Sequence, residues 1–436
     1  MMRTSLGRAA IWTGLGDATY ALCQWAVLMV LARLGTTEMV GQYALALAVT
    51  APVVIFANLG LRPLQSTDAR DQFTFDEYLR LRLSATCIAL LVIAVLALQY
   101  RLQTAAIVMA VGVAKAVESV SDVYFGLLQK HERMALIARS LALKGIVSII
   151  AFTVGFMISG TLLGAVCGLV LAWVAVLGVY DLPNGRVVLG RPVHARPLYD
   201  GIDWSRLRRL AGLAVPLGIG SMLLSLNTSI PRYVVESYWG ERALGLYAGM
   251  VYVGVAAGML VNSVGQTVTP RLSREWAAGA VSSFNRLLLG FGLLAAAWGT
   301  LGIALAWFAG EWFLGLLYGK QFSDESGVFV WVMGAAAVSH LASVMGFGMT
   351  AARIIMSQSV QFACVALVGL STAYLLIPRF GIRGAVWSLG LSWAFQLMLS
   401  FACLAGESVR RLQRQGLPSF YAGSVEKVAV EETASR

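Results

Sequence analysis

Residues 162–180 read LLGAVCGLVLAWVAVLGVY and contain no charged side chain. A helix rises 1.5 Å per residue, so about 20 apolar residues cross the roughly 30 Å hydrocarbon layer of a membrane. This stretch is apolar on every side, which is typical of a helix that contacts lipid or other apolar helices all round. The sequence therefore predicts a membrane-spanning helix here.

Similar stretches recur along the whole chain, so we expect an all-α polytopic membrane protein with about twelve spans. The expected spans are 9–33, 38–61, 83–100, 104–128, 137–159, 162–180, 211–236, 243–269, 287–309, 328–352, 357–377 and 384–405. The first span follows two arginines, as a signal peptide would, but it is too long for one and we expect it to stay in the mature protein.

The composition agrees with this prediction. Of 436 residues, 58% are hydrophobic and only 13% are charged, and the mean hydropathy is +0.75. Soluble domains are roughly 45–50% apolar and about 25% charged. A soluble protein could not bury this much apolar surface, so both departures favour a membrane protein.

Basic residues set the expected orientation. If the amino terminus is cytoplasmic, 24 of the 33 Lys and Arg residues fall in cytoplasmic segments and 5 in outer loops. Cytoplasmic loops of membrane proteins are enriched in Lys and Arg, so we expect both termini in the cytoplasm. The net charge of +11 is then explained by topology, and nucleic acid is not an expected partner.

Residues of the kind used in catalytic and metal sites are scattered. The five cysteines lie in apolar runs without metal-ligand spacing, and the three histidines have no repeated spacing. We expect no catalytic residues, no metal site and no cofactor.

Two motifs recur in the second half of the chain. GAVCGLVLAW at 164–173 and GAVWSLGLSW at 384–393 share six of ten positions. GQYA at 41–44 resembles GLYA at 245–248, and the same offset places Asn58 on Asn262. We therefore expect two parallel six-helix repeats around a central cavity, a plan found in transporters that work by alternating access.

The repeat and the position of prolines predict the domain organisation. We expect a first lobe at 1–180, a cytoplasmic linker with three prolines at 181–210, a second lobe at 211–406 and a cytoplasmic tail at 407–436. The tail begins with three arginines and then becomes acidic, which favours a short interfacial helix followed by a disordered end.

Polar side chains inside the spans are the candidate substrate site, because ionisable groups in a membrane are costly and usually face a cavity or a partner. Spacing by helical turns places them on shared faces: Asp17 and Gln24 on the first span, Lys115 and Glu118 on the fourth. The complete set expected to bind substrate in the cavity is Lys115, Arg232, Asp17, Asn58, Glu118, Gln24, Asn262 and Lys144.

Several of these residues have a purely structural alternative. Lys115 and Glu118 could pair within their helix. Asp17 could be a buried hydrogen-bonded acid. Arg232 could reach the interface or pair with Glu236, and for Lys144 reaching the interface is the favoured interpretation. The seventh span carries a polar face at Ser221 that we expect to oppose the Asp17 face across the cavity.

Five motifs in order resemble those of a polysaccharide flippase family within the multidrug/oligosaccharidyl-lipid/polysaccharide exporter superfamily. They are LG at 34–35 with VGQYA at 40–44, LLQKHERM at 127–134, TPRLSR at 269–274, LLYGKQF at 316–322 and IPRFGIRGA at 377–385. The resemblance implies two six-helix lobes around a partly cationic cavity. It also implies transport of an undecaprenyl-diphosphate-linked oligosaccharide across the bacterial inner membrane for surface polysaccharide biosynthesis.

The expected partners follow from this resemblance: the lipid-linked oligosaccharide, membrane lipids, and a polysaccharide polymerase and glycosyltransferases. Two alternatives remain open. The first is a cation-coupled multidrug antiporter of the same fold. The second, from another class, is a membrane-embedded polymerase, ligase or acyltransferase that acts on lipid-linked sugars, although the short outer loops argue against it.

Overall fold

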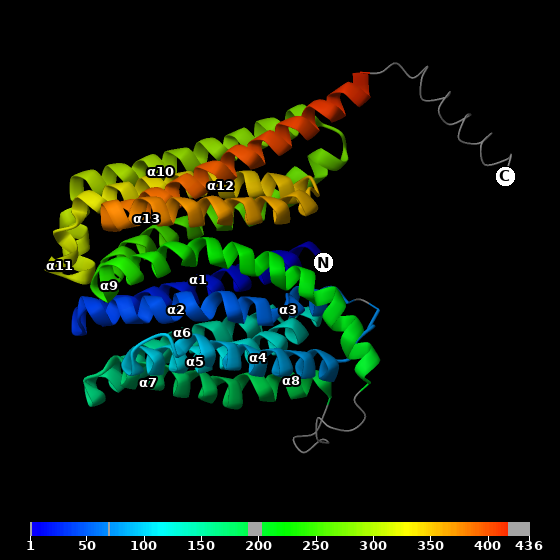
Figure 1. The fold of residues 1–436 in the computed structure, drawn as a ribbon. Helices are drawn as coiled ribbons and strands as arrows, with labels where there is room; N and C mark the ends of the chain where they lie inside the picture. Colours follow the sequence, from blue (N-terminus) through cyan, green and yellow to red (C-terminus); the bar gives the residue numbers. More distant parts are fainter. Residues whose placement is uncertain (1, 69, 191–202, 417–436) are drawn as a thin grey trace.

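The computed structural model describes residues 2–68, 70–190 and 203–416, and these contain helices and no strand (Figure 1). The first lobe, as we use the term, comprises α1 Met2–Leu34, α2 Thr37–Asn58, α3 Leu61–Thr67, α4 Phe75–Ala97, α5 Leu102–Lys130, α6 Met134–Ser159, α7 Leu162–Val176, the π-helix η1 Leu177–Asp181 and α8 Leu182–Leu189. The second lobe comprises α9 Trp204–Ala277, α10 Val281–Tyr318, α11 Lys320–Ser323, α12 Ser326–Ala351 and α13 Ile355–Gly416.

The number of membrane passages agrees with the twelve expected. Within the described residues, ten helical segments are long and apolar enough to span a bilayer. Two of them are double, because α9 turns at Gly240 and α13 turns at Gly381. Gly240 has φ 79° and ψ 179°, a conformation that is open essentially to glycine alone. Each glycine therefore joins two antiparallel spans through a very short turn.

Short polar residues begin the helices at the junctions. The Thr74 side chain accepts a hydrogen bond from the Glu77 backbone N–H, while the Glu77 side chain accepts from the Thr74 N–H, so α4 starts with a capping box. Thr36 caps α2 and Asp203 caps α9 in the same way through their side-chain oxygens. Both threonines and Asp203 lie beside apolar runs, so the sequence itself marks where these spans begin.

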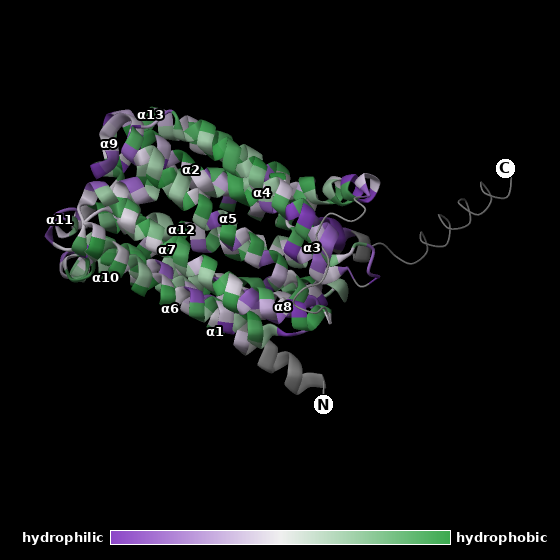
Figure 2. Ribbon diagram, turned by 90° about the horizontal axis from the view of Figure 1, so that it is seen from below, coloured by the Kyte–Doolittle hydropathy of each residue, from purple (hydrophilic) through white to green (hydrophobic). Residues whose placement is uncertain are grey.

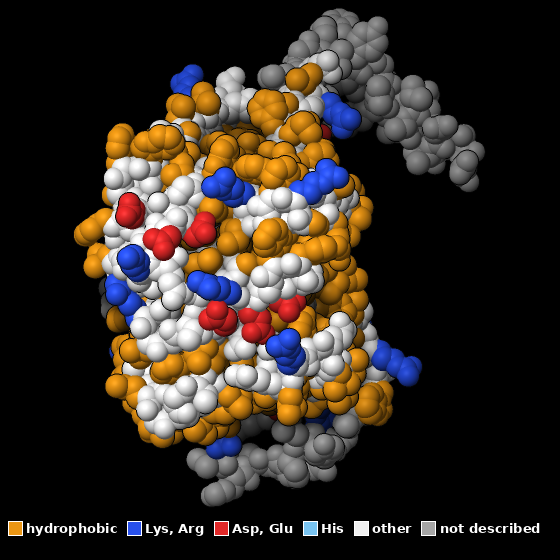
Figure 3. Space-filling model, turned by 60° about the vertical axis from the view of Figure 1, so that its left-hand side comes forward, with side chains coloured by type: hydrophobic (Ala, Val, Ile, Leu, Met, Phe, Trp, Pro, Cys, Tyr) orange, Lys and Arg blue, Asp and Glu red, His pale blue; other side chains and the backbone are white. Residues whose placement is uncertain are grey.

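The bundle has two ends, which we call the α1 end, where α1 begins and α13 finishes, and the α11 end, where α11 lies (Figure 1). Hydrophobic residues cover the length of the helices, and hydrophilic residues gather towards the two ends (Figure 2). At the α11 end, acidic and basic side chains lie together beside hydrophobic surface (Figure 3). This distribution is the one expected of a protein that spans a bilayer.

The two lobes share one hydrophobic core at the α11 end. That core joins residues such as Leu31 and Tyr43 of the first lobe to Tyr247, Tyr318 and Phe322 of the second. At the α1 end the described cores are separate. One lies within the second lobe, around Trp276 and Phe284, and one within the first lobe, while a third joins first-lobe residues such as Tyr78 to Leu210 at the start of α9. The larger core shared by the lobes therefore lies at the α11 end, and at the α1 end the start of α9 also packs against the first lobe.

Two glycines of the repeated motif lie where the lobes cross. A Cβ on Gly41 would lie 1.8 Å from the Glu241 carbonyl oxygen, and one on Gly245 would lie 2.1 Å from the Thr37 carbonyl oxygen. Gly41 and Gly245 are 204 positions apart, as are Thr37 and Glu241. The two contacts are thus reciprocal, which is what two parallel repeats related by a two-fold axis require.

The expected linker, 181–210, is shorter in the structure than in the sequence analysis. Asp181 ends the π-helix η1, residues 182–189 form α8, and α9 starts at Trp204. Residues 191–202 of the linker and 417–436 of the tail lie outside the described residues. The linker is shorter because Pro183 does not interrupt the helix: it lies in the first turn of α8, where a helix tolerates proline because that N–H has no helical partner.

Candidate functional site

A polar cavity of about 280 Å³ lies between α2 and α5 in the first lobe. Three of the residues expected to bind substrate line it, namely Asn58, Lys115 and Glu118, together with Ser119 and Asp122. The α5 residues lie on one face because they recur at helical spacing. The structure thus brings together the two helices whose polar residues the sequence analysis singled out separately.

Lys115 and Glu118 form an ion pair with Nζ and Oε2 2.7 Å apart. Glu118 Oε1 also accepts a hydrogen bond of 2.6 Å from the Tyr20 hydroxyl of α1. The Lys115 ammonium lies 5.2 Å from the centroid of the buried Trp173 ring, where a cation–π attraction adds to the ion pair. Both members of the pair are about a quarter exposed, 26% and 29%, so they are held in place and still accessible.

A second group of charges closes the cavity at the α1 end. Arg82 Nη2 lies 2.9 Å from Asp122 Oδ2, and Arg82 Nη1 donates to the Asn58 amide oxygen. Arg62 Nη1 lies 3.5 Å from the other Asp122 oxygen. Arg82 precedes the expected span at 83–100, but it lies in α4 and its side chain is fully buried. Arg82 lies on the buried side of α4, one turn after the buried Tyr78, and that spacing was the signal available in the sequence.

Lys144 does not line this cavity. Its Nζ lies 2.9 Å from Asp181 Oδ2 and both side chains are fully buried, at 1% and 0% exposure. The favoured expectation, that Lys144 reaches the membrane interface, was therefore wrong. Asp181 also accepts a 2.5 Å hydrogen bond from Ser140, and it was missed because it was assigned to the linker. The signal available in the sequence was an ionisable side chain at the end of an apolar span, where a charged partner is expected.

The remaining expected residues lie elsewhere. Asp17 is exposed and, among the described residues, has no ion pair or hydrogen bond. In the part of the chain that the structure describes, the Gln24 amide nitrogen is buried and has no hydrogen-bond partner. Arg232 lies over the Tyr252 ring, 5.5 Å from its centroid, and within the described part of the chain it forms no ion pair with Glu236. The expectation that the faces of Asp17 and Ser221 line one cavity remains a prediction.

Asn262 lines a separate cavity of about 160 Å³ in the second lobe, with Ser339, His340 and Ser343 of α12. His340 is buried, and neither of its ring nitrogens has a hydrogen-bond partner among the described residues. The sequence analysis did not select His340. The placement of Asn58 and Asn262 is equivalent, since each lies in a polar cavity of its own lobe, as the repeat implies.

The first-lobe cavity offers both charged and neutral polar groups. Lys115 supplies a charge-assisted donor, and Asn58 and Ser119 supply neutral hydrogen-bonding groups, while Arg62 and Arg82 contact Asp122 from outside the lining. Glu118 and Asp122 form ion pairs with these cations. Within the described residues, no group of three or more His, Cys, Asp or Glu side chains could hold a metal ion.

Comparison with known proteins adds a family to this geometry. Residues 6–276, more than half of the chain, match the family described as "Polysaccharide biosynthesis protein". The chain belongs to this polysaccharide biosynthesis protein family. A curated relative, the capsular polysaccharide biosynthesis protein CapF of Staphylococcus aureus, is 27% identical over 383 residues, which cover 87% of this chain and 94% of CapF.

Solved structures similar to this member of the polysaccharide biosynthesis protein family are transporters of one fold. An inward-facing MATE multidrug resistance transporter of the MOP superfamily has a TM-score of 0.66 at 11% identity, covering 93% of this chain and 96% of that one. An outward-facing MATE structure has a TM-score of 0.62 at 12% identity, covering 94% and 96%. A MOP superfamily transporter of Pyrococcus furiosus, described as having a binding pocket of reversed polarity, has a TM-score of 0.63 at 12% identity, covering 93% and 96%.

These findings confirm the expected all-helical transporter fold and the resemblance to polysaccharide flippases. The chain is a multi-pass membrane protein of a polysaccharide biosynthesis family, folded like MATE transporters. At these levels of identity the MATE likeness concerns the fold alone.

Proposed function

We propose that this protein moves an undecaprenyl-diphosphate-linked oligosaccharide across the bacterial inner membrane for surface polysaccharide biosynthesis. The observation that carries the proposal is the cavity of Asn58, Lys115, Glu118 and Asp122, within a polysaccharide biosynthesis protein. Its cations suit a diphosphate, and its amide and hydroxyl groups suit sugar hydroxyls.

The barrier to such transport is the transfer of an anionic, hydrated headgroup through hydrocarbon. A phosphate oxygen that reaches Lys115 has to compete with Glu118, whose carboxylate lies 2.7 Å from the ammonium. Binding therefore weakens one ion pair as it forms another, and it brings an anion close to Glu118, which keeps its hydrogen bond from the Tyr20 hydroxyl. The affinity of the site for the phosphate therefore stays moderate, so that the transporter can release its substrate.

The state of the lobes agrees with loading from the cytoplasm. Both chain ends are proposed to be cytoplasmic, and the lobes are fastened at the opposite, α11 end. We propose that the structure represents the inward-facing state and that release requires the α11 end to part. Glycosyltransferases, which make the substrate, and a polymerase, which consumes it, are the proposed protein partners.

The charge of Lys115 provides the decisive test. Lys115→Ala removes a charge-assisted contact of about 1.5–3 kcal/mol, so glycan delivery to the cell surface should fall about tenfold or more. Lys115→Arg retains the charge and should be milder, and Lys130→Ala, which removes an exposed ion pair with Asp71, should have little effect. Delivery would be measured as surface glycan, normalised to the amount of protein in the membrane.

Unchanged delivery by Lys115→Ala together with Arg62→Ala would contradict the proposal. The rival antiporter makes the opposite prediction, since a cation repels a cationic drug and the acidic Asp17 or Glu118 would be essential. Drug resistance in cells carrying Glu118→Gln separates the two functions. The polymerase or ligase alternative predicts that the purified protein joins lipid-linked sugars, whereas a flippase changes only their side of the membrane.

A further inference from the structure

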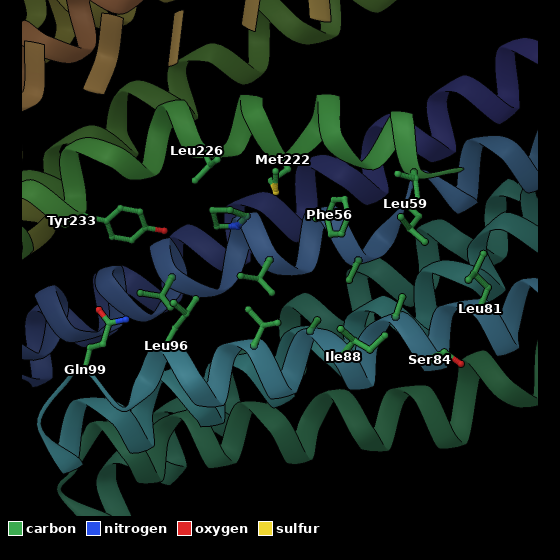
Figure 4. A pocket seen from close by; sticks show the side chains of 18 of the residues that line it. Phe56, Leu59, Leu81, Ser84, Ile88, Leu96, Gln99, Met222, Leu226 and Tyr233 are labelled. Atoms are coloured by element: carbon green, nitrogen blue, oxygen red, sulfur yellow. The ribbon is translucent and has the colours of Figure 1, made fainter. Parts of the chain in front are cut away.

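A long apolar groove runs between α2, α4 and the first half of α9 (Figure 4). Its volume is about 730 Å³, and side chains such as Phe56, Ile88, Leu96, Met222 and Leu226 line it. The few polar residues lie towards its ends, with Ser84 near the α1 end and Gln99 and Tyr233 near the α11 end (Figure 4). The groove is therefore suited to a hydrocarbon ligand and not to a sugar or an ion.

The groove extends well beyond one leaflet of the bilayer. Its lining residues on α4 run from Leu81 to Leu96, about 22 Å at 1.5 Å per residue, and Gln99 and Tyr100 continue the lining beyond the end of the helix; the hydrocarbon of a bilayer is roughly 30 Å thick, so one leaflet is about 15 Å. On its lipid side the groove is bordered by Ile88, 61% exposed, and Val92, 42% exposed. It is thus accessible from the membrane along its length.

The groove and the polar cavity share a wall at the α1 end. On α2, Asn58 lines the cavity and the next residue, Leu59, lines the groove. On α4, Leu81 lines the groove and Arg82 donates to Asn58 and pairs with Asp122. Adjacent residues of the same chain segments therefore line the apolar groove on one side and contact the charged cavity on the other.

We propose that this groove binds the polyprenyl chain of the lipid-linked substrate while its diphosphate and sugars occupy the neighbouring cavity. The inference rests on the proposed function and names a tail site for it. A phospholipid acyl chain reaches across about one leaflet, roughly half of the hydrocarbon layer. A single polyprenyl chain is long enough to fill a groove that extends beyond one leaflet, whereas a single acyl chain is not.

The proposal predicts that chain length governs affinity through the groove. We would compare undecaprenyl diphosphate with the short-chain farnesyl diphosphate as probes for binding to the full-length protein in nanodiscs. Wild-type protein should prefer the long chain. Ala85→Trp, which fills the groove, should weaken undecaprenyl diphosphate binding at least tenfold and leave farnesyl diphosphate binding nearly unchanged.

The matched control is Cys87→Trp, because Cys87 is exposed on the same helix and does not line the groove. A second variant covers the case in which Ala85→Trp fails to fold. Ile88→Asn places an amide at the exposed border of the groove and should weaken long-chain binding in the same direction, whereas Leu91→Asn, at the 68% exposed Leu91 outside the groove, should not.

Failure of the inference and failure of the proposed function give different results. If Ala85→Trp and Ile88→Asn retain the long-chain preference, or if mass spectrometry finds phospholipid in the groove that undecaprenyl diphosphate does not displace, the tail site is wrong. Loss of glycan delivery in Lys115→Ala would then leave the flippase function standing. If the wild type binds neither diphosphate and Lys115→Ala delivers glycan normally, both are wrong.

Discussion

At the scale of single residues, the pair Lys144 and Asp181 shows how this protein keeps charge inside a membrane. Neither charge is exposed, and the ring of Phe125 lies 4.8 Å from the Lys144 ammonium. Removing one member of such a pair leaves the other charged and without compensation in a low-dielectric site. The pair therefore stabilises the packing of α6 against the π-helix η1 only as long as both residues are present.

Replacing Asp181 by Asn should destabilise the protein by about 3–5 kcal/mol, because the buried Lys144 loses its counter-charge. The Asn side-chain amide can still accept the hydrogen bond of Ser140, so the loss of stability measures the effect of removing the charge. Asp71→Asn is the matched control, since Asp71 is 83% exposed in its pair with Lys130 and should cost at most about 1 kcal/mol. Thermal unfolding in detergent would measure both.

The double variant Lys144→Met with Asp181→Asn removes the uncompensated charge and should recover much of the stability lost in Asp181→Asn. If Asp181→Asn unfolds at the temperature of the wild type, the two residues do not form the charged pair described here.

At the scale of elements, the crossing of α2 with the second half of α9 depends on two glycines. Gly41 and Gly245 let a helix backbone approach the carbonyl of the other lobe more closely than any side chain would permit. Adjacent hydrogen bonds fix the crossing: Glu241 accepts from Gln42 at 2.8 Å and from Thr104 at 2.7 Å. Close approach and polar contacts thus lie at one place, at the α11 end.

Gly41→Ala should force α2 and α9 apart, because its Cβ would lie 1.8 Å from the Glu241 carbonyl oxygen. Overpacking of this kind costs typically 1–3 kcal/mol, which here weakens the state closed at the α11 end. We expect a lower unfolding temperature and faster labelling of a cysteine placed at Thr37. Gly212→Ala, a helical position with nothing within 4 Å of the added Cβ, is the control; equal effects of the two would refute the steric explanation.

At the scale of the whole molecule, contacts between the lobes lie mainly at the α11 end, apart from those of the start of α9, where Arg206 pairs with Glu77. Arg33, in the last turn of α1, donates to the carbonyls of Gly315 and Leu317 at 3.0 and 3.2 Å. Trp25 donates to the Tyr318 hydroxyl at 2.8 Å. If transport proceeds by the proposed alternating access, these contacts break when the α11 end opens.

Fastening this end permanently should stop transport. Thr37 and Gln321 are hydrogen-bonded across the lobes, so cysteines at both positions, in a variant without the native cysteines, should react with a short cleavable cross-linker. Cross-linking should abolish glycan delivery and cleavage should restore it, while each single-cysteine variant remains active under the same treatment. Undiminished transport by cross-linked protein would rule out opening at the α11 end.

The orientation of the molecule in the membrane can be tested independently. The ratio of 24 to 5 basic residues predicts that a reporter active only in the cytoplasm is active when fused after Arg436 and inactive when inserted near Lys320. The reverse pattern would place the α1 end outside, and the structure would then represent an outward-facing state.

The sequence by itself determined the number of spans, the helical class and the repeat. A stretch such as 162–180 crosses a membrane because of its own transfer free energy, which is nearly independent of the rest of the chain. Likewise, GQYA and GLYA recur because each occupies the same crossing, and that recurrence is visible without a structure. Lys115 and Glu118 were placed on one face because polar residues at helical spacing share a face, whereas nothing in the sequence placed Asn58, on another helix, beside them.

Tertiary structure alone decided which polar side chains meet. Arg82, Asn58 and Asp122 lie on three helices, and Lys144 and Asp181 on two more. Rotating a helix by 100°, the angle between successive residues, would turn a side chain from the cavity towards the lipid and bring the adjacent residue into the cavity. That rotation is determined by side chains of helices distant in sequence. For the same reason the groove beside α4 appears only when α2 and α9 are packed around it.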